Sequence, residues 1–572
     1  MTYDLKITGG TIVDGTGKAG FGGDVGISGG KVVALGKADG PATTTIDATG
    51  KVVSPGFVDV HTHYDAQILW DPLLTVSPWH GVTTAVMGNC GFTAAPTRPQ
   101  HRDLILRTFE RVEGMSLDAL NAGLGEDWGF TTYPEYLDAV ERRGMGINVA
   151  SLIGHTAVRL WVMGTDSVER AATDGEIAEM QRIVMEGLKA GAVGFSTSIA
   201  NAHFGFDGKQ VPSRLATREE RLAMASVLRE AGEGVYCFMG DRNVAWDEVI
   251  PLQRAADRHL VLAVITANSL GAGSHREPLR VAAGLIAAGI PIYPQTAGRP
   301  IVFEMDMRMP VMFYMWPCFQ PINQAGSSEE CKRIYASPDF RKTFRDAVDG
   351  IGVPGVQTAA GAEFARRRLS FGLVEISWYP PDTALEGRLL VDVAAERGMH
   401  AVDLMLDLAL GSDLAFRFRM PVAQFEEEGV GEIFQDPNVV VGLGDAGAHL
   451  SQLCDACYTT HILGHWVRDK GALTLERAVQ MLTSHPAHVF GIADRGLLAV
   501  GRPADVVVFD PATVGAGPLE RVFDLPAGAD RMVVKPTGID AVIVNGTVLP
   551  APGESLPSGT TLPGCLLRHG HA

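Results

Sequence analysis

The feature that most constrains the fold of this 572-residue chain is a repeated alternation in its middle part. Short apolar runs end in polar or glycine-rich loops, and segments with apolar residues at three- and four-residue spacing fall between many of them. About eight strands that alternate with helices are typical of a (β/α)8 TIM-type barrel, an α/β fold. The strand-like runs lie at 56–60, 82–87, 147–153, 192–196, 234–239, 261–266, 290–293 and 439–444, and the helical segments include 176–190, 218–231, 278–288 and 474–482.

Both ends of the chain have a different texture, with short β-rich runs separated by glycine turns. Asn545-Gly546 between two apolar runs is a strong signal for a two-residue hairpin. This spacing predicts one small antiparallel sheet domain built from both termini. Its strands are expected at 3–7, 11–13, 24–28, 31–35, 44–47, 504–510, 532–535 and 541–548.

One connection in the predicted barrel is unusually long. The gap between the seventh and eighth strands covers about 297–437. Connections of more than about 12–15 residues are uncommon unless they are functional or carry structure of their own. We therefore expect an inserted subdomain there, as a lid over the active site or as a subunit interface.

Composition and charge limit the kinds of molecule that the chain is expected to bind. The chain has 48 Lys and Arg against 66 Asp and Glu, a net charge of −18, with no sustained basic block, and this argues against a nucleic-acid partner. The apolar runs are too short to cross a membrane, and the N-terminus lacks a basic region followed by an apolar stretch. Seven scattered cysteines do not resemble a disulfide framework. We expect a cytoplasmic homo-oligomer that acts on a small-molecule substrate.

The strongest local signal for chemistry is the pair His61 and His63 at the end of the first predicted strand. Residues two apart on a strand point to the same face, so both rings would aim into the barrel at its carboxyl end. Two neutral imidazoles that converge on one point provide half of a zinc site. An ordinary pair of histidines at a strand end is the alternative for an isolated HxH.

Two further candidates follow other strands. Asp445 ends the eighth run, so a closed barrel would bring it beside the first strand, where a carboxylate can bind metal and accept a proton from water. The alternative is an aspartate that caps the turn before Gly447. Cys90 ends the second run and offers a thiolate, a good zinc ligand, although buried cysteines are more often inert core residues.

His155 ends the third run and is a candidate for substrate contact or metal binding, with a hydrogen-bonded structural histidine as the alternative. The single pair Cys454 and Cys457 lacks the second pair that a zinc ribbon needs. The chain also has no GxSxG motif of a serine hydrolase.

At these residues the chain resembles the amidohydrolase superfamily, in particular its N-acyl-D-amino-acid deacylase (D-aminoacylase) branch. The motifs that carry the resemblance are 7–15, 55–63, 81–91, 444–447, 484–491 and 495–505. The resemblance implies a metal-bearing barrel at 56–494 and a β-sandwich from 1–55 and 495–572. It also implies that Cys90 stands where other relatives have a carbamylated lysine, since 192–198 contains no lysine.

The chain departs from this branch in two places. Branch members have metal-binding histidines at the ends of the fifth and sixth strands, but 235–241 and 264–269 contain none. They also have an arginine shortly after the eighth-strand aspartate, whereas 449–465 contains neither arginine nor lysine. We therefore expect one metal per chain on His61, His63, Asp445 and Cys90, most consistent with zinc.

These observations predict a metal-dependent hydrolase of an amide-type C–N bond, other than a peptide bond, by attack of metal-activated water on the carbonyl. Asp445 is expected to move the proton to the leaving nitrogen. One alternative is hydrolysis of a cyclic amide or lactam. The other is a metal-depleted barrel that serves as a binding or scaffold subunit, motivated by the missing histidines.

Overall fold

The structure is a computed structural model that describes residues 2–205, 208–241, 243–313, 316–351, 370–554, 556 and 559–572. The chain divides into two compact units. The first contains 1–265, 276–299 and 431–572, and the second contains 266–275 and 300–430. Each is described by itself below.

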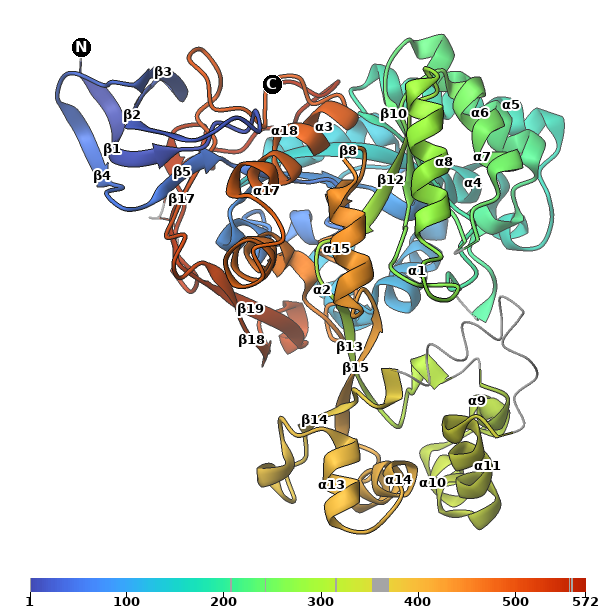
Figure 1. Cartoon of the computed structure of the whole chain (residues 1–572). Coiled ribbons are helices and arrows are strands. Elements are labelled where there is room, and N and C mark those ends of the chain that lie inside the picture. Colours follow the sequence, from blue (N-terminus) through green and yellow to red (C-terminus); the bar gives the residue numbers. More distant parts are fainter. Residues whose placement is uncertain are drawn as a thin grey trace. The chain divides into compact units, whose positions relative to one another are not determined.

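The first unit contains the barrel expected from the sequence. Eight parallel strands follow one another around it in chain order, and Figure 1 labels β8, β10 and β12 among them. They are β6 (Phe57–Asp59), β7 (Val82–Met87), β8 (Asn148–Gly154), β9 (Gly194–Ser198), β10 (Val235–Met239), β11 (Leu260–Ala263), β12 (Ile292–Ala297) and β16 (Val440–Gly442). The predicted strands are confirmed with shifts of a few residues at their ends.

The barrel is closed just beyond the ends of its first and last strands. The Asp445 backbone N–H donates to the carbonyl of His61 at 3.1 Å, and the His63 N–H donates to the carbonyl of Ala446 at 2.7 Å. These bonds satisfy backbone groups that would otherwise be buried without partners. They also bring the segments that carry the predicted ligands side by side.

Several helices of this unit begin at a side-chain cap. Thr173 accepts from the Glu176 N–H, and Glu176 reaches back to the Thr173 N–H, which is a capping box at the start of α5. The helices are α1 (Arg102–Glu113), α2 (Leu117–Leu124), α3 (Tyr133–Arg143), α4 (His155–Met163), α5 (Asp174–Lys189), α6 (Arg218–Ala231), α7 (Trp246–Ala256), α8 (Arg276–Ala287), α16 (Tyr458–His461), α17 (Leu475–Leu482) and α18 (Ser484–Val489), while α15 (Glu427–Gln435) precedes β16. All four predicted helices are present.

The chain's last residues pack into the barrel core. The Leu567 N–H donates to the carbonyl of Val149 in β8 at 2.7 Å, and the Leu567 side chain is fully buried. It belongs to a cluster of strand residues from the barrel interior, which includes Val58, Val86, Leu152, Val235 and Val440. The residues after about 563 therefore help to fill the barrel.

Both termini share one sheet, as expected. The strand order is β21-β20-β17-β5-β1-β2-β3, with β4 beside β1, and Figure 1 shows the N-terminal β5 next to the C-terminal β17. The bounds are β1 (Tyr3–Ile12), β2 (Phe21–Ser28), β3 (Lys31–Gly36), β4 (Ala42–Asp47), β5 (Val52–Pro55), β17 (Val506–Phe509), β20 (Ile539–Val544) and β21 (Thr547–Val548).

The details of this sheet correct the sequence expectation. The sheet is mixed, because β4 and β5 both run parallel to β1. The two runs predicted at 3–7 and 11–13 form one strand, interrupted by an irregularity at Gly9, which has φ +70°. The run at 532–535 belongs to a separate hairpin of β18 (Gly515–Val522) and β19 (Arg531–Thr537). The predicted Asn545-Gly546 hairpin is confirmed between β20 and β21.

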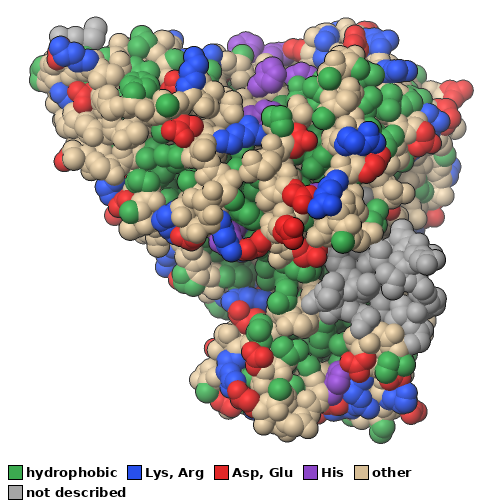
Figure 2. Space-filling model, viewed as in Figure 1, with side chains coloured by type: hydrophobic (Ala, Val, Ile, Leu, Met, Phe, Trp, Pro, Cys, Tyr) green, Lys and Arg blue, Asp and Glu red, His purple; other side chains and the backbone are tan. Residues whose placement is uncertain are grey.

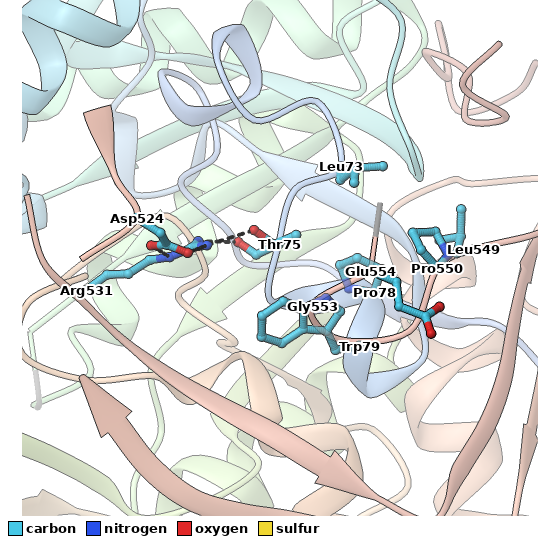
Figure 3. A pocket seen from close by; sticks show the side chains of 10 residues that line it. All are labelled: Leu73, Thr75, Pro78, Trp79, Asp524, Arg531, Leu549, Pro550, Gly553 and Glu554. Carbon is cyan, nitrogen blue, oxygen red and sulfur yellow. Dashed lines mark hydrogen bonds and ion pairs between the residues drawn. The ribbon is translucent and has the colours of Figure 1, made fainter. Parts of the chain in front are cut away.

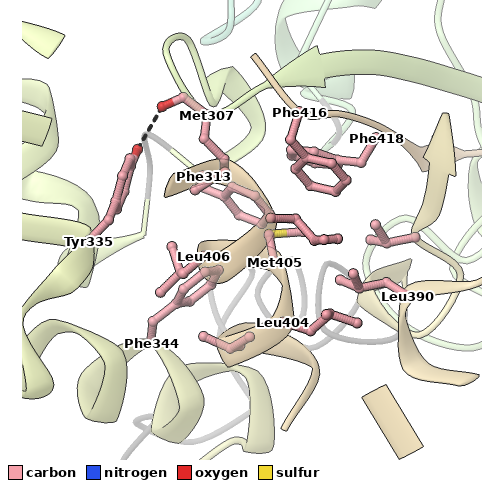
Figure 4. Close-up of a cluster of buried hydrophobic side chains, with 14 of the residues drawn as sticks. Met307, Phe313, Tyr335, Phe344, Leu390, Leu404, Met405, Leu406, Phe416 and Phe418 are labelled. Carbon is pink, nitrogen blue, oxygen red and sulfur yellow. Dashed lines mark hydrogen bonds between the residues drawn. The ribbon is translucent and has the colours of Figure 1, made fainter. Parts of the chain in front are cut away.

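The second unit has its own hydrophobic core. An antiparallel sheet of β13 (Ile301–Asp306), β15 (Arg417–Ala423) and β14 (Glu375–Trp378) occurs together with α9 (Gln320–Asn323), α10 (Ser328–Ala336), α11 (Pro338–Asp349), α13 (Leu390–Glu396) and α14 (Ala401–Gly411). Figure 4 shows Phe313, Phe344 and Phe418 among the buried side chains of this core. In sequence, 300–430 falls where an insertion at about 297–437 was expected between the seventh and eighth strands.

On the face drawn in Figure 2, acidic and basic side chains are interspersed, and neither kind forms a continuous patch. Within the described ranges, every helix is too short or too polar to cross a bilayer.

Replacing Leu567 with alanine tests the role of the chain end in the barrel. We expect Leu567→Ala to lower the free energy of unfolding by about 2–5 kcal/mol, because it opens a cavity in a closely packed core. The exposed His571 gives a matched control, and His571→Ala should change stability by less than about 0.5 kcal/mol. Denaturant titrations measure both; equal stabilities of the two variants would contradict the assignment.

Candidate metal centre

The two histidines of the first strand end present the same ring nitrogen to one point. His61 Nδ1 lies 2.9 Å from Gln295 Oε1 at the end of β12. Since that oxygen only accepts, Nδ1 carries the proton and Nε2 offers its lone pair. His63 Nδ1 lies 3.2 Å from Glu113 Oε1 as an ion pair rather than a hydrogen bond, and its Nε2 faces the centre, 3.3 Å from Asp445 Oδ1. Both side chains are buried.

Cys90 lies in a tight turn after β7. It is the middle residue of a short 3-10 segment (Asn89–Gly91) and has φ +55°, a left-handed conformation that is uncommon for cysteine. The turn brings Cys90 Sγ to 3.3 Å from His61 Nε2. Such sparsely populated backbone conformations concentrate at functional sites.

Asp445 has the same kind of backbone conformation, with φ +45°. Its Oδ1 lies 3.7 Å from His61 Nε2 and 3.3 Å from His63 Nε2. Gly447 follows with φ +89°, and a Cβ there would stand 2.4 Å from the carbonyl oxygen of His63. Glycine is therefore required where the eighth-strand loop passes the first.

These four donors have a spacing that suits a metal ion. One donor each from His61, His63 and Cys90 lies within 4.8 Å of the others, and Asp445 adds a carboxylate oxygen. Tetrahedral zinc with bonds of 2.0–2.3 Å separates its donors by about 3.3–3.8 Å, and imidazole, thiolate and carboxylate are all zinc ligands. The donor set fits a divalent metal.

Burial and mutual charge shift the pKa values of these groups apart. Burial lowers the pKa of His61 to about 4 and raises the pKa of the Cys90 thiol to about 11. Burial would also lower the pKa of His63, but the Glu113 charge and the Asp445 hydrogen bond hold it well above its usual value. For Asp445, burial is outweighed by the hydrogen bond and charge of His63, and its pKa lies well below the ordinary range.

His155 has a different environment from the one expected. Its Nδ1 lies 2.8 Å from Thr197 Oγ1 and its Nε2 lies 2.9 Å from Glu220 Oε1. Glu220 also pairs with Arg159, and all of these side chains are fully buried. Both ring nitrogens are occupied within the barrel wall, so these contacts do not support the expected role in substrate binding or metal ligation.

Three residues near the centre were missed by sequence reasoning. Glu113 ends α1, and His203 and His449 lie in the loops after β9 and β16. The charges of His63 and Asp445 act on the pKa of both histidines, although burial is the largest cause of their lowered values. None of the three lies in a motif; their only sequence signal is a position within a loop or helix that follows a barrel strand.

An arginine from another part of the sequence lies beside the segment that follows the eighth strand. Arg299, two residues after β12, donates from Nη1 to the Cys454 carbonyl at 2.8 Å and lies 3.3 Å from Asp455 Oδ1. The same Nη1 lies 2.9 Å from Cys457 Sγ. An arginine is thus present beside 449–465, although that stretch of sequence contains none.

A cavity of about 170 Å³ opens elsewhere in the first unit (Figure 3). Its arginine, Arg531, is held by both oxygens of Asp524 and by Thr75, as the dashed lines show in part. None of the four candidate donors lines this cavity, so it is separate from the candidate metal centre.

A parallel barrel with a histidine pair, a cysteine and an aspartate at the carboxyl ends of its strands is the architecture of a metal-dependent hydrolase. The chain belongs to the amidohydrolase family, whose model matches residues 44–301 and 382–550.

Among known relatives, a D-aminoacylase of Alcaligenes xylosoxydans xylosoxydans is 30% identical over 549 residues, covering 95% of this chain and 94% of the relative. A solved D-aminoacylase structure, described for a binuclear metal centre with one-metal activation and second-metal attenuation, has a TM-score of 0.65 at 27% identity and covers 99% of this chain and all of its own. An N-acyl-D-glutamate deacylase of Bordetella bronchiseptica, solved with zinc and a phosphonate mimic of the tetrahedral intermediate, has a TM-score of 0.64 at 28% identity, with the same coverage.

The pKa shifts predict that metal binding depends on pH. Near pH 7 the metal-free protein holds a proton on Cys90 and another on His63, and both must leave before these groups can act as ligands. We expect about two protons to be released per zinc ion, so affinity should fall as the pH is lowered. Calorimetry in buffers of different ionisation enthalpy counts these protons.

A cysteine variant tests which group supplies one of these protons. Cys90→Ser should weaken zinc binding and reduce the release by about one proton, whereas Cys318→Ser, in the second unit, should change neither. Proton release that is the same in all three proteins would contradict ligation by Cys90.

Proposed function

We propose that this protein is a D-aminoacylase-like hydrolase that cleaves the amide C–N bond of an N-acylated amino acid with the help of one zinc ion. The observation that carries the proposal is the convergence of His61 Nε2, His63 Nε2, Cys90 Sγ and Asp445 Oδ1 on one point at the carboxyl end of the barrel. The full-length similarity to deacylases supports the reaction class.

A single ion is favoured by the donors that the chain offers. The strand ends of β10 and β11 lack the histidines of the resembling branch, and Met239 ends β10 instead. A thioether is a poor substitute for imidazole on zinc. When bound, the metal supplies a Lewis acid that polarises the amide carbonyl and makes water more acidic.

The protein's own groups then divide the work of hydrolysis. Gln295 is hydrogen-bonded to His61 Nδ1 and Glu113 lies beside His63 Nδ1, while both Nε2 atoms face the centre. Asp445 has a strongly lowered pKa and is therefore ionised at neutral pH, so it can accept a proton from the attacking water and return it to the leaving nitrogen. Its Oδ1 lies 3.7 Å from His61 Nε2 and 3.3 Å from His63 Nε2, beside the place that the metal and the substrate carbonyl would occupy.

Arg299 is the candidate for attraction of an acidic substrate. Its guanidinium lies beside the segment that follows Asp445, and it shares its charge with Asp455 at 3.3 Å. Arginine binds carboxylates in a two-pronged geometry. A free carboxylate on the substrate would have to compete with Asp455, which predicts a weaker preference for charged substrates than an unpaired arginine would give.

A screen of N-acyl-D-amino acids, N-acyl-L-amino acids, hydantoins and lactams tests the reaction class. We expect release of a free amino group from N-acyl-D-amino acids, abolished by chelation and restored by zinc. Turnover of hydantoins or lactams alone would replace the proposal with cyclic-amide hydrolysis. A protein that binds zinc but turns over none of the four classes would favour a binding role.

Replacing Asp445 with asparagine tests the proton transfer. Asp445→Asn keeps the size of the side chain but removes its basicity, so kcat should fall by about 10²–10⁴-fold while the folded structure persists. The exposed Asp469 gives the control, and Asp469→Asn should retain full turnover. Steady-state kinetics at matched zinc content measure the effect, and wild-type turnover in the Asp445 variant would exclude Asp445 from the mechanism.

A further inference from the structure

We propose that Glu113 is a positioning residue of the metal centre, which fixes the ring of His63 and makes it a stronger donor than His61. The inference rests on the proposed function, because it requires metal at His61 and His63. Glu113 is remote in sequence from every motif of the site and belongs to α1, in the connection between β7 and β8.

The placement of this carboxyl group is costly by itself. Glu113 is 3% exposed and is the last residue of α1. The C-terminal end of a helix carries partial negative charge, which disfavours a carboxylate there, and burial disfavours it further. Among the described residues, no lysine or arginine forms an ion pair with Glu113, in contrast to Glu220, which pairs with Arg159.

The contact that remains is with His63. Glu113 Oε1 lies 3.2 Å from His63 Nδ1, while Nε2 on the other side of the ring lies 3.3 Å from Asp445 Oδ1. The ring therefore lies between two carboxylates, with one carboxylate oxygen near each of its nitrogens. A carboxylate on the outer nitrogen of a metal-binding histidine fixes the ring orientation and raises the basicity of the inner nitrogen.

The backbone fixes the position of Glu113 independently of its side chain. Its carbonyl oxygen accepts from the His449 N–H, and the carbonyl of Gly114 accepts from Ser451 Oγ at 3.3 Å. Both donors belong to the loop that follows Asp445. The end of α1 is thus fastened to the same loop that supplies the fourth donor.

The two histidines differ in this second contact. His61 has the neutral amide oxygen of Gln295 on its Nδ1, whereas His63 has a carboxylate. A neutral acceptor orients the ring, and a charged one also increases its electron density. The structure therefore assigns orientation of His61 to Gln295, and both orientation and donor strength of His63 to Glu113.

Replacing Glu113 with glutamine tests the charge without changing the size of the side chain. We expect Glu113→Gln to weaken zinc binding by about 10–100-fold, as loss of such outer partners does elsewhere. The metal-free variant should also lose stability, because removing one charge of a buried histidine–carboxylate pair leaves the other without its partner. Chelator competition measures affinity, and denaturant titration of both metal-free proteins measures stability.

Two further variants make the result specific. Glu113→Asp keeps the charge on a shorter side chain and should recover part of the lost affinity. Glu110→Gln removes a charge from an exposed position of the same helix and should leave zinc affinity unchanged. The absorption spectrum of bound cobalt should change in Glu113→Gln and not in Glu110→Gln, because only the first alters a ligand's donor strength.

The outcomes separate this inference from the proposed function. A wild-type protein that binds no zinc overturns both. Wild-type binding together with equal affinity in Glu113→Gln overturns the role of Glu113 alone and leaves the metal centre intact. A metal-free Glu113→Gln protein that is destabilised, with unchanged affinity, would make Glu113 a purely structural residue and would also overturn the inference.

Discussion

The candidate metal centre depends on the backbone closure between the first and eighth barrel strands. Two hydrogen bonds, from Asp445 N–H to the His61 carbonyl and from His63 N–H to the Ala446 carbonyl, join the segments just past the strand ends. All parallel strands of a closed barrel end at the same rim. This pairing therefore brings His61 and Asp445, almost four hundred positions apart in sequence, into one site. The donor distances of 3.3–3.7 Å follow from that register.

The residues around this closure include buried polar and charged groups, whose removal from water costs free energy. Cys90 and Asp445 both have left-handed backbones, and the site buries a thiol, two imidazoles and the Glu113 carboxyl. Such an arrangement destabilises the metal-free protein through desolvation and strain. A bound cation would make it favourable, because the same groups would then be ligands or their partners. Under the proposed function, the site and the fold would be coupled through the metal.

The chain shares the fold and nearly the full length of the deacylases it resembles, and its candidate donors gather on one part of the barrel rim. The fifth and sixth strands offer no histidine, whereas the first, second and eighth supply four donors. Positive charge also reaches the loop after the eighth strand from Arg299 at the end of the seventh.

The sequence by itself determined the local features. Strand and helix periodicity predicted the barrel, the Asn545-Gly546 turn predicted the terminal hairpin, and spacing of two residues aimed His61 and His63 at one face. Contacts between distant segments were decided by tertiary structure alone. These include the parallel pairing of β4 and β5 with β1, the packing of Leu567 into the barrel, the enclosure of His155 by Thr197 and Glu220, and the approach of Glu113 to His63. The physical reason is that periodicity reports which face of one element is buried, whereas the partner of a buried polar group depends on which other element packs against it.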